Sequence, residues 1–152
     1  MKLLVAYDGS ESSKNALQEG INMVKARGGE VLLYTAIEVV DYFDPLPLGE
    51  ATLIARKLPP EEVKERVQKA GDKVQEEAKK ELKKAEVAFR TQIDYGSPRA
   101  DICEVAEKEG TDMIVVGSRG LGTIKRMFLG SVSQYVVNHA PCSVLVVRPP
   151  KM

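Results

Sequence analysis

Short apolar runs along this chain alternate with longer stretches in which apolar residues recur every three or four positions. The runs at 3–7, 31–37, 113–116 and 143–147 are apolar almost throughout, which is typical of parallel strands that are covered on both faces. The segment 87–93 alternates apolar and polar residues and is the least apolar of the set. It predicts a strand at or near an edge of the sheet.

Helical spacing fills most of the sequence between these runs. Serine at the start, proline in the first turn and glycine after the end are the residues that begin and end helices. They predict helices over residues 10 or 12 to 25, 59–85, 97–110 and 131–138, with Ser97 as a capping residue. The segment from about 38 to 60 contains several prolines and fits no period, so it predicts a long loop insertion.

Strands that alternate with helices predict a parallel sheet, and right-handed crossovers leave few topologies. The expected fold class is α/β, a flavodoxin-like or Rossmann-like doubly wound sheet of five parallel strands in the order 3-2-1-4-5, with helices on both faces. No repeat, low-complexity tract or linker divides the chain. We therefore expect one domain over residues 1–152.

Composition narrows the classes of function. The 22 basic and 22 acidic residues cancel, which argues against bulk electrostatic binding to nucleic acid or to an anionic membrane. No apolar run has the length of a membrane span or a signal peptide, so we expect a cytoplasmic protein. Cys103 and Cys142 have no second cysteine or histidine at metal-ligand spacing, and we expect them to be small buried thiols.

The expected strand order also predicts where a ligand binds. In this topology the order reverses between the first and fourth strands, and ligands bind at the carboxyl ends there. Asp8 follows the first strand and Gly117 follows the fourth. A carboxylate can accept from ribose hydroxyls or hold a metal, while glycines and the helix start near Ser131 let phosphate meet backbone amides. The combination predicts a nucleotide site.

Simpler interpretations of the same residues remain open. Asp8 also fits a turn with an Asx cap, Gly117 and Gly120 fit ordinary turns, and Ser131 fits an ordinary N-cap. Arg119 either balances phosphate charge or is simply solvated.

Catalytic groups are scarce in the sequence. The G-x4-G-K-[ST] phosphate loop is absent. The one histidine, His139, ends the last predicted helix, where we expect a capping or packing role. At most, Asp8 with a bound metal would support slow cleavage of a phosphoanhydride.

Four segments together resemble one protein family. The spacing Gly117-x2-Gly120-x9-Gly130-Ser131 resembles the ATP-binding motif of the universal stress protein family. Similarity to the first strand, fourth strand, last helix and fifth strand of that family is carried by LLVAYDGSESS, MIVVGSRG, LGSVSQYVV and PCSVLVVRP. The resemblance spans nearly the whole chain.

The resemblance implies a flavodoxin-like fold, ATP in the crevice with Mg or Mn on its phosphates, and a homodimer through the last strand, Ser143 to Val147. It implies that Asp8 meets the ribose and that Ala36 presents its backbone to adenine. The candidate nucleotide-binding residues are Asp8, Ala36, Gly117, Arg119, Gly120, Gly130, Ser131, Val132 and Ser133.

Three functions follow as hypotheses. The leading one is an ATP-binding regulatory module of the stress response, because the glycine and serine pattern is complete while catalytic groups are scarce. The second is a slow metal-dependent ATPase that uses Asp8. The third is a nucleotide-free dimeric interaction protein in which the glycines serve only the fold. Pairing of the apolar strand 143–147 with a second copy would cover a sheet edge, although Pro149 and Pro150 also blunt that edge.

Overall fold

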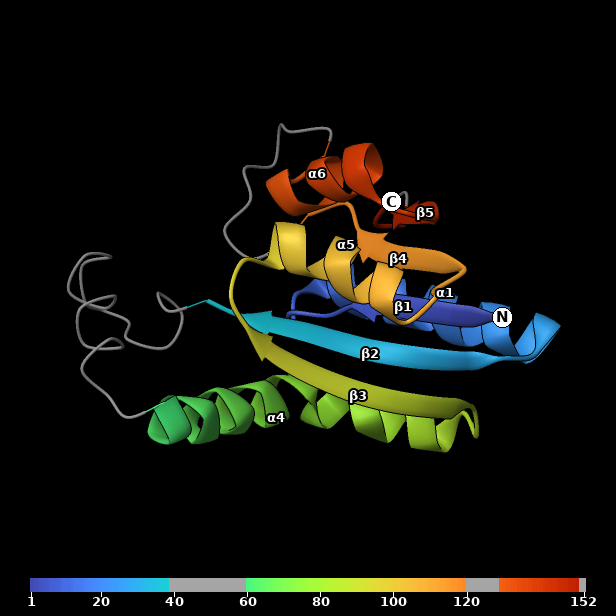
Figure 1. Cartoon of the computed structure of the whole chain (residues 1–152). Helices are drawn as coiled ribbons and strands as arrows, with labels where there is room; N and C mark the ends of the chain where they lie inside the picture. Colours follow the sequence, from blue (N-terminus) through green and yellow to red (C-terminus); the bar gives the residue numbers. More distant parts are fainter. Residues whose placement is uncertain (39–59, 120–128, 151–152) are drawn as a thin grey trace.

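The computed structural model describes residues 1–38, 60–119 and 129–150. It contains a five-stranded sheet in the order β3-β2-β1-β4-β5, and all neighbouring strands run parallel (Figure 1). The strands are β1 (Lys2–Ala6), β2 (Glu30–Ile37), β3 (Ala88–Tyr95), β4 (Met113–Gly117) and β5 (Ser143–Val147). The helices are α1 (Glu11–Arg27), α4 (Pro60–Lys84), α5 (Pro98–Lys108) and α6 (Ser131–His139). The expected fold class and strand order are confirmed.

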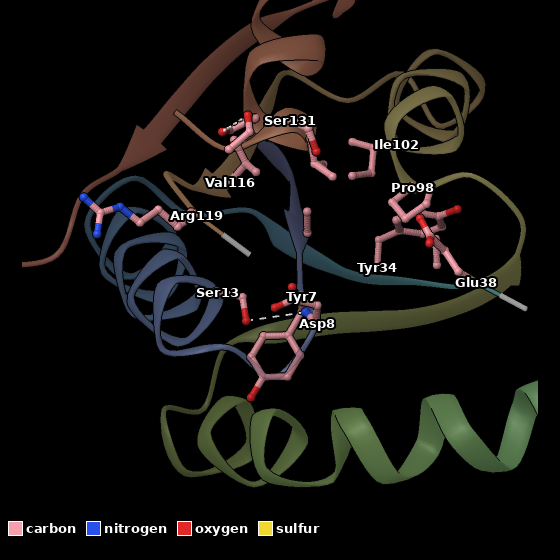
Figure 2. A pocket seen from close by; sticks show the side chains of 16 residues that line it. Tyr7, Asp8, Ser13, Tyr34, Glu38, Pro98, Ile102, Val116, Arg119 and Ser131 are labelled. Carbon is pink, nitrogen blue, oxygen red and sulfur yellow. Dashed lines mark hydrogen bonds between the residues drawn. The ribbon is translucent and has the colours of Figure 1, made fainter. Parts of the chain in front are cut away.

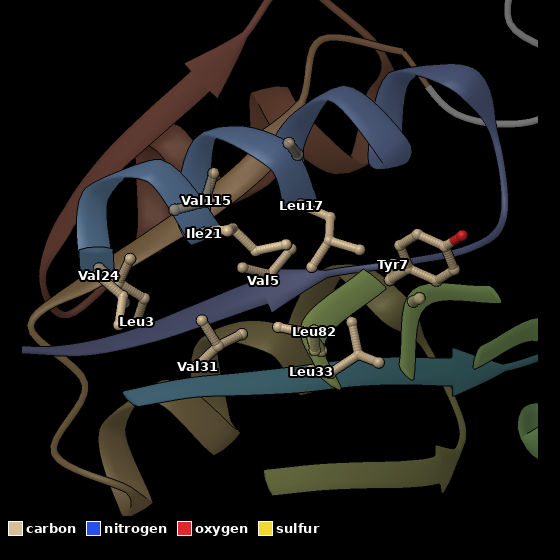
Figure 3. Close-up of a cluster of buried hydrophobic side chains, with 12 residues drawn as sticks. Leu3, Val5, Tyr7, Leu17, Ile21, Val24, Val31, Leu33, Leu82 and Val115 are labelled. Carbon is tan, nitrogen blue, oxygen red and sulfur yellow. The ribbon is translucent and has the colours of Figure 1, made fainter. Parts of the chain in front are cut away.

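One face of the sheet packs against α1 and α4. Side chains at alternate positions of β1, Leu3 and Val5, meet Leu17 and Ile21 of α1, and Leu82 of α4 lies in the same cluster (Figure 3). Successive side chains of a strand point to opposite faces of the sheet. Because these strands are continuously apolar, the other face of the sheet must be covered as well.

The opposite face packs against α5 and α6. Leu4 of the central strand β1 and Leu32 of the adjacent strand β2 form a second cluster with Ile102, Val105 and Val136. These two clusters explain why the central strands lack the polar alternation of a half-exposed sheet.

Helix starts differ in detail from the sequence expectations. Ser10 rather than Ser12 caps α1, and its Oγ accepts a hydrogen bond from the Ser13 amide at 3.2 Å. Ser97 occupies the N-cap position of α5, but its side chain makes no capping hydrogen bond. The N-cap of α6 is Gly130, so the alternative in which Ser131 is an ordinary N-cap is wrong. Of the loop insertion expected at 38–60, residues 39–59 lie outside the described residues.

The edges of the sheet are formed by β3 and β5, as expected for β3 from its polar pattern. The apolar residues of β5 from Val144 to Val147 are only partly buried. Cys103 and Cys142 are free and partly buried, where small buried thiols were expected. Burial raises the pKa of both thiols. None of the helices within the described ranges is long and apolar enough to cross a membrane.

Truncation of Leu82 tests whether α4 is part of the core. Its side chain is fully buried between α4 and the sheet. We expect Leu82→Ala to lower the free energy of unfolding by about 2–5 kcal/mol in chemical denaturation, because it leaves a cavity. The neighbouring exposed variant Lys83→Ala is the control and should change it by less than about 0.5 kcal/mol. Equal effects of the two substitutions would contradict this packing.

Candidate functional site

A cavity of about 270 Å³ opens at the carboxyl ends of β1, β2 and β4 (Figure 2). Its floor lies on the sheet face that packs against α5 and α6. On that face Ala6 follows Leu4 along β1, and Ala36 follows Tyr34 along β2. These small side chains leave space where larger ones would fill it. The volume is near the lower end of small-molecule sites, which run from roughly 300 to 1,000 Å³.

Asp8 lines the cavity directly after β1. Its Oδ1 accepts a hydrogen bond from the Ser10 amide at 2.9 Å, and its own amide donates to Ser13 Oγ at 3.4 Å. Gly9 between them has a φ of 85°, a left-handed conformation that favours glycine. The Asx turn and the cavity position, which the sequence left as alternatives, therefore coexist.

Gly117 allows β4 to approach the first turn of α1. A Cβ atom at this position would lie 2.7 Å from the carbonyl carbon and oxygen of Ser12. Just beyond it, the Arg119 amide donates a hydrogen bond to Ser12 Oγ at 3.1 Å. The backbone that begins the glycine loop, at residues 117–119, is thus held against the first turn of α1. No side chain at position 117 fits between the loop and the helix.

The N-terminus of α6 forms another wall of the cavity. Gly130 is buried, and its amide donates to the Ser118 carbonyl at 2.7 Å. The first intrahelical bond runs from the Gln134 amide to the Gly130 carbonyl at 3.0 Å. The amides of residues 131–133 therefore precede the helical ladder and are the donors that a helix start offers to an anion.

The two hydroxyl groups of this turn differ. Ser133 is buried, and its Oγ lies 3.2 Å from the Ser118 carbonyl and 3.0 Å from the Gly130 carbonyl. A hydroxyl has one hydrogen to donate, so that of Ser133 is already directed at backbone carbonyls. Ser131 is exposed and lines the cavity.

Tyr34, Glu38 and Pro98 lie together at one end of the cavity, across from Arg119 (Figure 2). The Tyr34 hydroxyl is buried and has no hydrogen-bonding partner among the described residues. Burial raises the pKa of Tyr34 strongly, and the negative charge of Asp94 adds to this shift. The hydroxyl therefore stays protonated at neutral pH.

The sequence-predicted site residues converge. Those that line this one cavity are Asp8, Ala36, Gly117, Arg119, Gly130, Ser131, Val132 and Ser133. Gly120 lies outside the described residues, so its place in the site stays a prediction.

The sequence reasoning missed Tyr34, Pro98 and Ile102 as lining residues. Tyr34 carried a usable signal, because it precedes Ala36 by two positions in a strand and so shares its face. Nothing in the pattern pointed to Pro98 and Ile102, since their place follows from where α5 starts relative to β2.

His139 has the packing role expected for it. It is exposed at the end of α6, its Nδ1 lies 2.9 Å from the Tyr135 carbonyl, and the rings of His139 and Tyr135 stack with centroids 4.0 Å apart. Within the described ranges, no three His, Cys, Asp or Glu side chains are grouped so that they could hold a metal ion.

The architecture defines a flavodoxin-like α/β protein with a cavity at the switch point of its sheet. Residues 1–148 match the sequence model of the universal stress protein family, and the chain belongs to this family. A similar curated relative is universal stress protein YxiE of Bacillus subtilis (strain 168), which is 35% identical, with 97% of this chain and 98% of the relative covered.

Solved structures agree with this assignment. The structure of hypothetical protein MJ0577 is 28% identical with a TM-score of 0.80, and the alignment covers 99% of this chain and 97% of that one. A universal stress protein solved in complex with cAMP is 25% identical with a TM-score of 0.60, and 97% of this chain and 96% of that one are covered. The fold of the family and the fold described above are the same.

Substitution of Gly117 tests the close approach to α1. We expect Gly117→Ala to lower the free energy of unfolding by about 1–3 kcal/mol, because its methyl group collides with backbone atoms of Ser12. Ser12→Ala is the matched control, since it removes only the hydrogen bond from the Arg119 amide and should cost about 0.5–1.5 kcal/mol. Thermal or chemical denaturation measures both. A Gly117→Ala protein as stable as wild type would rule out the contact.

Proposed function

We propose that this protein is a cytoplasmic, nucleotide-binding regulatory module of the stress response that holds ATP in the cavity at the ends of β1 and β4. One observation carries the proposal: the amides at the start of α6 and the carboxylate of Asp8 line the same cavity. Helix-start amides suit an anionic phosphate, and a carboxylate suits ribose hydroxyls.

The phosphates are proposed to lie at the α6 end of the cavity. Gly117 and Gly130 line the cavity there without a side chain, and Ser131 adds an exposed hydroxyl. Ser133 contributes its amide, since its hydroxyl hydrogen is directed at backbone carbonyls. Arg119 supplies positive charge at that side of the cavity, and Gly120 is proposed to complete the glycine loop.

Adenine is proposed to lie toward Ala36 and Tyr34. The walls of that end include the apolar side chains of Ala36, Ile102 and Pro98 together with the acidic Glu38. Tyr34 also lines this end of the cavity, while its hydroxyl is buried away from the open space. An apolar slot with few polar groups is the usual environment of a bound base.

The comparison with a relative supports a nucleotide as the ligand. The universal stress protein solved with cAMP aligns with 97% of this chain at 25% identity. Its ligand shares adenine, ribose and phosphate with ATP, and those are the groups that the residues above fit.

A divalent ion, Mg or Mn, is proposed to bind through the phosphates. The described residues do not group three or more metal-ligating His, Cys, Asp or Glu side chains, so the protein alone offers such an ion few ligands. Ions of this kind are often held by one or two carboxylates together with substrate phosphates, and Asp8 lies at the cavity. The ion would neutralise phosphate charge.

Equilibrium dialysis against labelled ATP with Mg²⁺ tests the proposal. We expect binding, with affinity falling from ATP to AMP to adenosine as phosphates are removed from the α6 amides. Ser131→Ala should weaken ATP binding about tenfold or more, because a hydrogen bond to a charged group is lost. No binding at millimolar ATP would contradict the proposed function.

Ser133→Ala is the matched control for that experiment. Its hydroxyl bonds to the Ser118 and Gly130 carbonyls, so its loss should lower stability by about 1 kcal/mol. Its effect on ATP affinity should be clearly smaller than that of Ser131→Ala. The reverse order of effects would move the phosphate contact from Ser131 to Ser133.

A homodimer through Ser143 to Val147 is proposed as the unit that responds to ATP. Support comes from the partly buried apolar side chains of β5 at an open edge of the sheet. The end of this strand is tied to the site, because the Ser118 amide donates to the Val147 carbonyl at 2.9 Å while the Ser118 carbonyl accepts from Gly130. Ser118 therefore links Gly130, where the nucleotide is proposed to bind, to the strand β5, where the dimer is proposed to form.

Analytical ultracentrifugation with and without ATP tests this assembly. We expect the mass of two chains, and a dimer dissociation constant that changes on addition of ATP. Ser143→Lys should weaken the dimer, since an exposed edge lysine opposes strand pairing. Gln134→Lys on the exposed surface of α6 is the charge-matched control. A monomer at all concentrations would contradict the dimer, and an unchanged constant would contradict its coupling to ATP.

A further inference from the structure

A chain of buried hydrogen bonds runs from the middle of α4 to the end of β1. Gln75 on α4 is fully buried, and its Nε2 donates to Thr35 Oγ1 at 2.9 Å. Thr35 is also buried, and its Oγ1 donates in turn to the Tyr7 carbonyl at 2.7 Å. Neither Gln75 nor Thr35 lines the cavity, so neither belongs to the set that meets the ligand.

The Gln75 amide is held in one orientation. Besides Thr35, its Nε2 lies 3.3 Å from the carbonyls of both Leu33 and Gln92. Exchange of its nitrogen and oxygen would place Oε1 against these two acceptors, so only the present orientation fits. Because the amide donates to Thr35, the Thr35 hydroxyl directs its own hydrogen to Tyr7.

This arrangement is costly for a purely structural contact. Gln75 Oε1 is buried and has no hydrogen-bonding partner among the described residues. A buried, unsatisfied acceptor costs free energy, whereas an apolar side chain of similar shape is often neutral or stabilising. Buried polar groups that break this rule are found mainly at functional sites. We therefore expect the chain of hydrogen bonds to hold a functional residue in place.

What it holds is the peptide that leads into Asp8. The last residue of β1 is Ala6, and the Tyr7 amide still bonds to the Tyr34 carbonyl at 2.9 Å. The Tyr7 carbonyl belongs to the planar peptide that joins Tyr7 to Asp8, so the hydrogen bond from Thr35 fixes the rotation of that plane. The direction in which Asp8 leaves the sheet is set at this point.

We propose that Thr35, oriented by Gln75, is a positioning residue that aims the Asp8 carboxylate into the cavity and thereby sets its selectivity for ribose hydroxyls. The selectivity part rests on the proposed nucleotide-binding function, and the positioning part stands without it. Thr35 acts through the backbone of Asp8 and does not touch the ligand.

Thr35→Val tests this role, because valine keeps the shape of threonine and removes the hydroxyl. The dissociation constants of ATP, 2′-deoxy-ATP and 3′-deoxy-ATP are measured by equilibrium dialysis. Wild type should bind ATP more tightly than at least one deoxy analogue, and Asp8→Ala should abolish that preference. Thr35→Val should reduce the preference about fivefold, and Thr35→Ser, which keeps the hydroxyl, should restore it.

A control separates positioning from lost stability. Val31 is fully buried in the same strand as Thr35, but it lies toward the opposite end of the sheet and does not line the cavity. Val31→Ala should lower the free energy of unfolding and leave the ratio of ATP to deoxy-ATP affinity unchanged. A ratio that falls equally in Val31→Ala and Thr35→Val would overturn the positioning role.

Hydrogen exchange decides the inference even if no nucleotide binds. The Ser10 amide is protected by Asp8 Oδ1 at 2.9 Å, so its exchange rate reports on the orientation of that carboxylate. Thr35→Val should accelerate exchange at Ser10 about fivefold relative to Val31→Ala. Unchanged protection at Ser10 would overturn the inference, whereas absent ATP binding with accelerated exchange would overturn only the proposed function.

Discussion

The parallel pairing of β1 with β4 is the constraint on which the rest of the site depends. Val5 lies opposite Val115 in this ladder, so the two strands end side by side. Asp8 and Gly117, remote in sequence, reach the same cavity as a result. The pairing is possible because α1 crosses over one face of the sheet and because Gly117 lets the end of β4 approach the first turn of that helix.

Space and hydrogen bonding at this meeting point are set by small residues and by buried polar groups. Ala6 and Ala36 are smaller than Leu4 and Tyr34, which lie two positions earlier on the same face of their strands. The small side chains leave the cavity open at this end of the sheet. Ser118 joins β5 to the start of α6 through its amide and carbonyl. The cavity and the exposed sheet edge are thus parts of one hydrogen-bonded unit, and this unit motivates a regulatory rather than a catalytic proposal.

The sequence predicts the fold well because the fold depends on patterns that can be read locally. Continuous apolar runs mark strands covered on both faces, and these runs located four of the five strands. Tertiary contacts decided what the pattern left open: Ser10 caps α1 while Ser12 meets the loop after β4. Gln75 had no signal at all, because a glutamine within a charged helix looks like any solvated residue until the helix is placed on the sheet.

The central claim is that a nucleotide occupies the cavity between Asp8 and the start of α6. A crystal structure of the protein grown with ATP and Mg²⁺ tests it most directly. The account predicts density for phosphates at the amides of residues 131–133 and a ribose hydroxyl within hydrogen-bonding distance of Asp8. Nucleotide bound elsewhere on the protein, with this cavity filled by water alone, would contradict it.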